Sequence, residues 1–141
     1  MRQARTVVLD NEAVQALADP AHHKHRRVVA VVEAAVARNL RRADAVRLVV
    51  PTCVRVEAGW NRRDPGAAVV NRLRIDDVTL DTLTANEAAG IRSSLGVSVV
   101  DAHLGAVLGV TAGPHAVLTS DADDLRRIAK HLGARPTILA V

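Results

Sequence analysis

Four acidic residues stand at positions where acids are unusual and where they could act together. Each of them follows a short apolar run or lies on the helix expected after one. Asp10, for example, ends the run Thr6-Val-Val-Leu9, although aspartate is disfavoured in a buried strand. In open parallel sheets, ligands bind beside the carboxyl ends of the strands, so these carboxylates are expected to meet at one rim. The four residues are Asp10, Glu57, Asp101 and Asp121.

Each of these acids also has an ordinary structural interpretation, which the sequence leaves open. Asp10 could cap a helix that starts at residue 11, and Glu57 could form an internal salt bridge. Ser98 and Asp101 have the spacing of a capping box. One or two acids of the segment 121–124 could stabilise a helix N-terminus through the helix dipole.

Taken together, the acids favour a metal site. Four carboxylates within a few ångströms would repel one another and raise each other's pKa unless cations neutralised them. Hard divalent cations with oxygen ligands are the natural counter-charge. We therefore expect a divalent cation at this rim, where the loop carrying Asp121 could meet Asp10.

Composition sets the broader limits. The 141 residues carry a formal net charge of +4, with a pI near 10.5, which favours an anionic partner such as nucleic acid. Trp60 is the one aromatic residue, and a single cysteine, Cys53, cannot form an internal disulfide, which indicates a reducing compartment. The sequence has no signal-peptide pattern and no apolar run near the ~18 residues of a membrane span, so we expect a cytoplasmic protein with no membrane contact.

The elements that must position the acids alternate along the chain as strand and helix. This alternation predicts a single α/β domain over 1–141, with a central parallel sheet and helices on both faces, as a three-layer fold. A capping box, Thr84 to Glu87, is expected to open one of the helices. The predicted strands are 6–10, 47–50, 77–80, 115–119 and 137–141. The predicted helices are 11–18, 22–43, 53–60, 67–73, 84–96, 98–110 and 122–132.

The ordered set of motifs resembles a PIN domain, and specifically the VapC-type toxin ribonucleases of type II toxin–antitoxin systems. The resemblance spans the whole chain in the family's order, with Asn11 where Ser or Thr is more usual. The motifs are Val7-Val-Leu-Asp10, Val56-Glu57, Val99-Val-Asp101-Ala and Leu118-Thr-Ser-Asp-Ala-Asp-Asp-Leu125.

The resemblance implies a PIN-like fold, a homodimer, and an endoribonuclease that uses Mg²⁺ or Mn²⁺. It also implies neutralisation by a small cognate antitoxin protein. Asp10, Glu57, Asp101 and Asp121 would be the catalytic acids and metal ligands, with Asp123 as a fifth ligand; whether Asp123 or Asp124 joins the site stays open. Asn11 and Thr119 would be supporting polar residues, and Arg62 and Arg63 could hold RNA phosphates.

On this hypothesis a water activated by the metal attacks the phosphodiester, and no histidine is needed as a base. The alternative is a PIN-like module that binds RNA or protein without catalysis. A receiver-like domain would need an acidic pair directly after the first strand, and a haloacid-type phosphatase would need Asp-x-Asp there. The sequence has Asp10-Asn-Glu12, so both fit less well.

Overall fold

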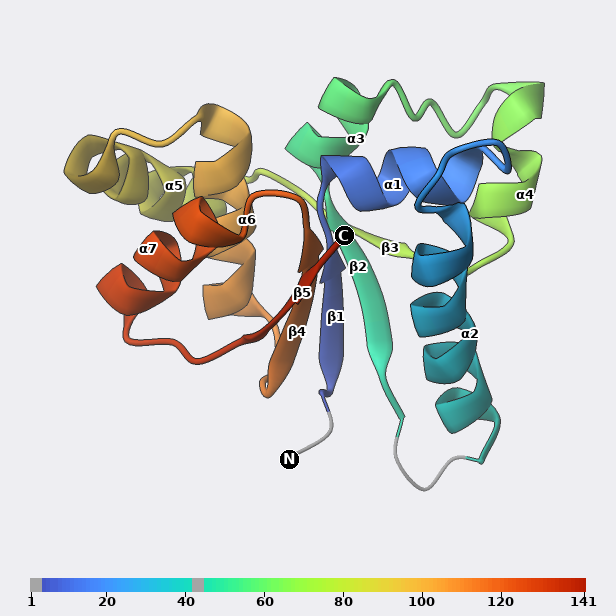
Figure 1. The fold of residues 1–141 in the computed structure, drawn as a ribbon. Coiled ribbons are helices and arrows are strands. Elements are labelled where there is room, and N and C mark those ends of the chain that lie inside the picture. The colour runs from blue at the N-terminus through green and yellow to red at the C-terminus, as the bar shows by residue number, and fades with distance from the viewer. Residues whose placement is uncertain (1–3, 42–44) are drawn as a thin grey trace.

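The computed structural model describes residues 4–41 and 45–141, and within them one sheet of five parallel strands forms the centre of the molecule (Figure 1). The strand order is β3-β2-β1-β4-β5, so β1 lies in the middle with β2 and β4 on either side. The predicted α/β class with an all-parallel sheet is confirmed. The strands are β1 (Thr6–Leu9), β2 (Arg47–Pro51), β3 (Asp76–Val78), β4 (His115–Thr119) and β5 (Thr137–Ala140).

Helices cover both faces of the sheet. In Figure 1, α1, α2 and α4 lie on one side of the strands, and α5, α6 and α7 lie on the other. The helices are α1 (Asn11–Ala18), α2 (His25–Arg41), α3 (Thr52–Ala58), α4 (Ala68–Asn71), α5 (Thr82–Leu95), α6 (Val99–Val110) and α7 (Ala122–Leu132), and a 3-10 turn, η1 (Pro65–Ala67), precedes α4.

The three central strands, β1, β2 and β4, are largely apolar because both of their faces are buried. Val7 and Leu9 of β1 belong to the core beneath α1 and α2, whereas Val8 packs with α6 and α7 on the opposite face. β2 and β4 alternate in the same way. Strands buried on two sides have no polar face to display, which is why the sequence reads as continuous apolar runs.

Several predicted boundaries are wrong by one to three residues. β1 ends at Leu9, so Asp10 lies beyond it as the helix cap. β3 was expected at 77–80, but it ends at Val78, because the Leu80 amide donates to the Thr52 hydroxyl at 3.2 Å instead of continuing the ladder. The predicted end of the long second helix at residue 43 falls outside the described residues.

Two helix ends differ for identifiable reasons. The residue that caps α5 is Asp81 rather than Thr84, and the two form a reciprocal capping box in which Thr84 is the third helical residue. α3 ends at Ala58 because Gly59 adopts a left-handed conformation, with φ of 70°. Trp60 was expected as the last residue of the helix 53–60, but it lies beyond the end of α3.

The three helices on one face pack closely at a glycine. A methyl group built on Gly105 of α6 would lie 2.7 Å from Ile128 Cγ2 of α7 and 3.0 Å from Ile91 Cδ1 of α5. Only glycine therefore lets α6 approach both neighbours at this point. None of the helices in the described part of the chain is long and apolar enough to cross a membrane.

Candidate metal centre

Asp10 lies at the carboxyl end of the central strand and is held by both of its oxygens. Its side chain is 7 % exposed. Oδ1 accepts a hydrogen bond from the Asn11 amide at the start of α1, and Oδ2 accepts one from the Thr119 hydroxyl. The capping hydrogen bond thus holds the Asp10 carboxylate at the rim, where the sequence predicts a site residue.

Thr119 connects the ends of two strands. Its buried hydroxyl donates to Asp10, while the same oxygen accepts from the Asp121 amide at 2.9 Å. The Asp10 amide in turn donates to the Leu118 carbonyl at 3.0 Å. The predicted supporting residue therefore aligns the turn after β4 with the end of β1, as the sheet order requires.

Three carboxylates from two helices gather beside this turn. Asp101 in the first turn of α6, Asp121 at the cap of α7 and Asp124 in the first turn of α7 each offer an oxygen within 4.8 Å of the others. Ser98 caps α6 by accepting from the Asp101 amide at 3.1 Å, and its side chain also contacts the Asp101 carboxylate, which partly offsets the rise of that group's pKa. We call Asp10, Asp101, Asp121 and Asp124 the acid cluster.

The structure separates the two acids between which the sequence could not decide. The Asp123 side chain is 95 % exposed and pairs with Arg126 at 2.9 Å, so it points away from the cluster. Asp124 is three residues from Asp121 and therefore shares its helical face. It is more shielded and also contacts Arg127 at 3.2 Å. The i, i+3 spacing from Asp121 is the one sequence signal that could have favoured Asp124.

The electrostatics of the acid cluster are those of crowded carboxylates. Burial raises the pKa of Asp101 from 3.8 to about 6, and the charges of Asp10, Asp121 and Asp124 add to the rise. The pKa of Asp121 is also raised, first by burial and then by its contact with Asp124. Asp10 is thus close enough to perturb both Asp101 and Asp121. Such mutual repulsion is relieved when a cation binds among the carboxylates.

Glu57 has a different position from the other predicted acids. It is exposed on α3 and makes no hydrogen bond or ion pair with the residues at 4–41 and 45–141. The helix itself packs against α1, which starts beside Asp10, and against α6, which carries Asp101. Glu57 therefore lies on a helix that borders the acid cluster, without joining the three carboxylates that meet there.

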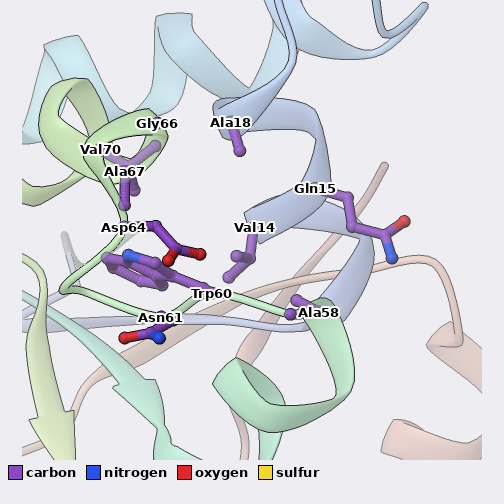
Figure 2. A pocket seen from close by; sticks show the side chains of 11 residues that line it. Val14, Gln15, Ala18, Ala58, Trp60, Asn61, Asp64, Gly66, Ala67 and Val70 are labelled. Carbon is purple, nitrogen blue, oxygen red and sulfur yellow. The ribbon is translucent and has the colours of Figure 1, made fainter.

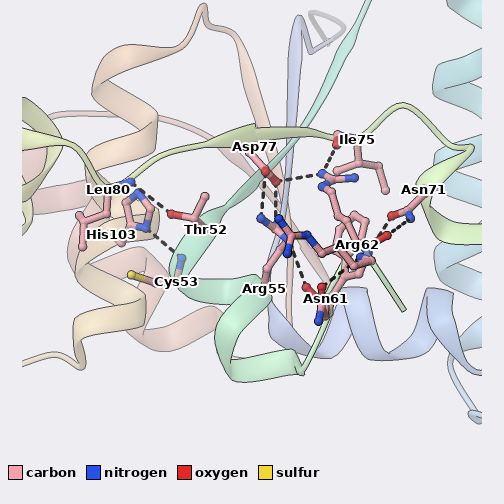
Figure 3. A network of polar contacts seen from close by, with 12 residues as sticks. Thr52, Cys53, Arg55, Asn61, Arg62, Asn71, Ile75, Asp77, Leu80 and His103 are labelled. Carbon is pink, nitrogen blue, oxygen red and sulfur yellow. Dashed lines mark hydrogen bonds and ion pairs between the residues drawn. The ribbon is translucent and has the colours of Figure 1, made fainter. Parts of the chain in front are cut away.

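The two arginines considered for RNA binding are placed differently. Arg62 donates to Asp77 at 2.9 Å and to the Ile75 carbonyl at 2.6 Å (Figure 3). Its guanidinium also lies 4.3 Å from the Trp60 ring centre. Arg55 contacts the same Asp77 carboxylate at 2.8 Å. Arg62 thus joins the loop after α3 to β3, whereas Arg63 is exposed. Sequence reasoning missed Asp77 as the centre of this network.

His103 and Trp60 have packing roles. His103 is fully buried, its Nδ1 lies 3.4 Å from the Cys53 amide, and burial lowers its pKa, which keeps the ring neutral. Trp60 is 8 % exposed and donates to Asn71 at 3.1 Å. Trp60 lines a cavity of about 160 Å³ between α1 and the loop that follows α3. Figure 2 shows its ring among the other lining residues. Neither residue touches the acid cluster.

Two solved structures share this fold over nearly the whole chain. The crystal structure of VapBC2 from Rickettsia felis bound to a DNA fragment from their promoter has a TM-score of 0.58 and 8 % identity, and covers 96 % of this chain and 98 % of that chain. The crystal structure of FitAcB from Neisseria gonorrhoeae has a TM-score of 0.57 and 16 % identity, and covers 94 % and 96 %. No protein-family model and no curated protein sequence matches. At such identities the likeness concerns the fold, and it agrees with the predicted PIN-like architecture.

Proposed function

We propose that this chain is the toxin of a type II toxin–antitoxin pair and that it is an endoribonuclease dependent on Mg²⁺ or Mn²⁺. The observation that carries the proposal is the acid cluster, which brings together residues distant in sequence at the carboxyl rim of a PIN-like sheet. One of the solved structures with this fold is a VapBC complex, and the sequence motifs resemble VapC-type toxins.

The residues present fit a hard divalent cation. The acid cluster supplies carboxylate oxygens only, which suit Mg²⁺ and Mn²⁺ and do not suit soft metals. Burial first, and then the neighbouring carboxylates, raise the pKa of Asp101 and Asp121, and a bound cation would offset both effects. Asn11, next to Asp10, adds a buried amide oxygen with no hydrogen-bond partner in the described chain. These oxygens would hold the ion or its water molecules.

The protein's own part in the reaction is to hold these groups in place. Thr119 fixes the Asp10 carboxylate, and the Asp121 amide anchors the turn to the same hydroxyl. The N-termini of α1, α6 and α7 meet at the rim, and their dipoles favour negative charge there. A bound Mg²⁺ or Mn²⁺ would supply an activated water and would neutralise charge on the phosphodiester. Glu57 is proposed as a further acid that acts from the bordering helix α3.

The proposal includes partners. RNA is the substrate, and a small cognate antitoxin protein is the inhibitor. The named structures are complexes, and the VapBC2 structure holds a promoter fragment, which supports a paired protein for this chain as well. A homodimer is proposed from the family resemblance. A non-catalytic binding module would retain RNA without any need for a divalent cation. The experiment must therefore distinguish metal-dependent cleavage from metal-independent binding.

The test is cleavage of a fluorescent RNA by purified protein, with Mg²⁺, with Mn²⁺ and with EDTA. We expect cleavage with either metal and none in EDTA. Asp10→Asn and Asp101→Asn should lower the rate at least about 100-fold, since each removes a charge from the site. Glu87→Gln, an exposed acid in the middle of α5, is the matched control and should cleave like the unmodified protein. Full activity of Asp101→Asn, or cleavage that persists in EDTA, would contradict the proposal.

The neighbouring acids provide a second comparison. Asp124→Asn should weaken Mn²⁺ binding and cleavage, because its oxygen lies within the acid cluster. Asp123→Asn should change both much less, because that side chain is exposed on the other side of α7. Equal losses in the two variants would mean that the cation is not held by the carboxylates that meet in this structure.

A further inference from the structure

A basic hollow lies between the second half of α7 and the beginning of β5. It has a volume of about 490 Å³ and is lined by three cationic side chains over a floor of small apolar residues. We call it the α7–β5 hollow. Its cationic residues are Arg126, Lys130 and Arg135, and its other lining residues are Ala129, Ala134, Pro136 and Ile138.

The cations of the hollow are available to a ligand. Lys130 and Arg135 are exposed and form no ion pair with any other residue that the structure describes. Arg126 contacts only the carboxylate of Asp123, and the two side chains are 63 % and 95 % exposed. An exposed pair of this kind contributes little and exchanges readily for another anion.

Arg127, which is next to Arg126 in sequence, shows that cations are available on only one side of α7 among the described residues. Arg127 donates to the Leu95 carbonyl of α5 at 2.9 Å and contacts Asp124 at 3.2 Å, so it is engaged on the far side of α7. Arg126 and Lys130, four residues apart, share the side that faces β5. They are separated by one helical turn, about 6 Å along the axis.

The hollow and the acid cluster share α7 but lie on different sides of it, because Arg126 pairs with Asp123, which points away from the cluster, whereas Arg127 pairs with Asp124. Asp121 caps this helix and Asp124 is in its first turn, both in the acid cluster. Arg126 follows in the second turn, Lys130 in the third, and Arg135 lies in the connection to β5. A single helix thus carries acids at its start and then a row of cations that leads away from them along the edge of the sheet.

We infer that the α7–β5 hollow binds the phosphate backbone of the RNA strand whose scissile phosphate lies at the acid cluster. This inference rests on the proposed function and identifies where its substrate is held. The row of cations matches a polyanion, and an RNA strand that passes around α7 would reach both the hollow and the acid cluster. With no aromatic side chain in the hollow, bases have no surface on which to stack, so the contact is to phosphates and independent of base sequence.

A second arginine-rich groove provides the control surface. It is lined by Arg5, Arg72 and Arg74 and lies at the amino ends of the strands, where β1 and β2 begin. The acid cluster is at the opposite, carboxyl ends. The residues that line this groove include none from α6 or α7, the helices that carry Asp101, Asp121 and Asp124. An RNA strand held there would therefore not follow a helix that leads to the acids, although the positive charge of the groove is comparable.

The experiment measures binding of a fluorescein-labelled, unstructured 20-nucleotide RNA by fluorescence polarisation in EDTA, where no metal-dependent cleavage occurs. For Arg126→Ala/Lys130→Ala/Arg135→Ala, loss of three phosphate contacts should lower the slope of log affinity against log salt by about 2. At about 0.15 M salt the same loss weakens binding roughly 50-fold, by counterion release alone. Arg72→Ala/Arg74→Ala is the control and should leave the slope near that of the unmodified protein.

Other outcomes would overturn the inference. One such outcome is an RNA affinity of the triple variant within twofold of that of the unmodified protein. Another is an equal loss of RNA affinity in the control variant, which would indicate that RNA is attracted by the total charge of the protein. Displacement of the RNA by an equimolar poly-glutamate peptide would assign the hollow to an acidic protein instead. Circular dichroism melts verify that the exposed substitutions leave the fold intact.

The inference and the proposed function can fail separately. If RNA binding depends on the hollow but Mg²⁺ and Mn²⁺ give no cleavage, the assignment of RNA binding to the hollow is upheld and the nuclease proposal fails. If cleavage occurs with unchanged KM in the triple variant, the nuclease proposal stands and the hollow is not the RNA site.

Discussion

Replacing Asp101 by asparagine should stabilise the metal-free protein at neutral pH. The folded pKa of Asp101 is raised to about 6, so the folded state binds this proton more tightly than the unfolded chain does. The free energy of unfolding therefore falls as pH rises from about 4 to 6, and the loss is complete above pH 7. An asparagine side chain at this position would carry no charge at any of these pH values, and the Ser98 cap uses the backbone amide, which the substitution keeps.

The magnitude follows from the size of the pKa rise. A change from 3.8 to about 6 corresponds to an upper bound of about 3 kcal/mol. Because Asp101 is partly exposed, solvent screening reduces this to about 1–2 kcal/mol. For a domain of 141 residues, that stabilisation raises the Tm by about 3–8 °C.

The assay is thermal denaturation of both proteins in EDTA at several pH values between 4 and 8, repeated with Mg²⁺. The Tm difference in favour of Asp101→Asn should be near zero at pH 4 and reach its full size by pH 7. Mg²⁺ should raise the Tm of the unmodified protein much more than that of the variant, because the ion relieves the same repulsion. A variant that is less stable than the unmodified protein at pH 7.5 in EDTA would refute the argument that Asp101 lies among uncompensated carboxylates.

Three further pairs of substitutions test the contacts that support the site and the fold. Thr119→Val should lower the free energy of unfolding in urea by about 1–3 kcal/mol, since it leaves Oδ2 of the buried Asp10 carboxylate and the Asp121 amide without their partner, whereas Thr119→Ser should restore most of it. Arg62→Ala should cost about 2–4 kcal/mol and Arg63→Ala less than about 0.5 kcal/mol; equal effects would contradict the ion-pair network. Gly105→Ala should destabilise the protein by about 1–3 kcal/mol, because the added methyl group overpacks the contact with α5 and α7. Gly109→Ala, which has open space around it, should stabilise the protein by about 0.5–1 kcal/mol. Similar melting temperatures for the two variants would disprove the close approach of the helices.

Much of the fold follows from local patterns in the sequence. Runs such as Thr6-Val-Val-Leu9 indicate strands buried on both faces, and their alternation with helical segments implies a parallel sheet. The errors lie at element ends, where long-range contacts decide. Thr84 has the local features of a cap, but Asp81 takes that role. Leu80 leaves β3 because Thr52, far away in sequence, supplies its hydrogen bond.

The candidate site could be predicted only in part. The positions of Asp10, Asp101 and Asp121 after strands or at helix starts were sufficient to expect them at one rim. The sequence left open whether Asp123 or Asp124 turns inward, because both are acids of one helical turn and the packing of α7 decides which side faces the cluster. Nor could it indicate that Arg62 is already engaged by Asp77, since an ion pair across a loop leaves no periodic pattern.

The sequence by itself determined the elements, their order and the acids that end up near strand ends, because propensity and burial act on neighbouring residues. The tertiary structure alone decided which carboxylates share space and how strongly they perturb one another. Desolvation and Coulomb repulsion depend on distances between atoms, and the side chains of Asp10 and Asp121 acquire those distances only when β1 and β4 pair and Thr119 connects their ends.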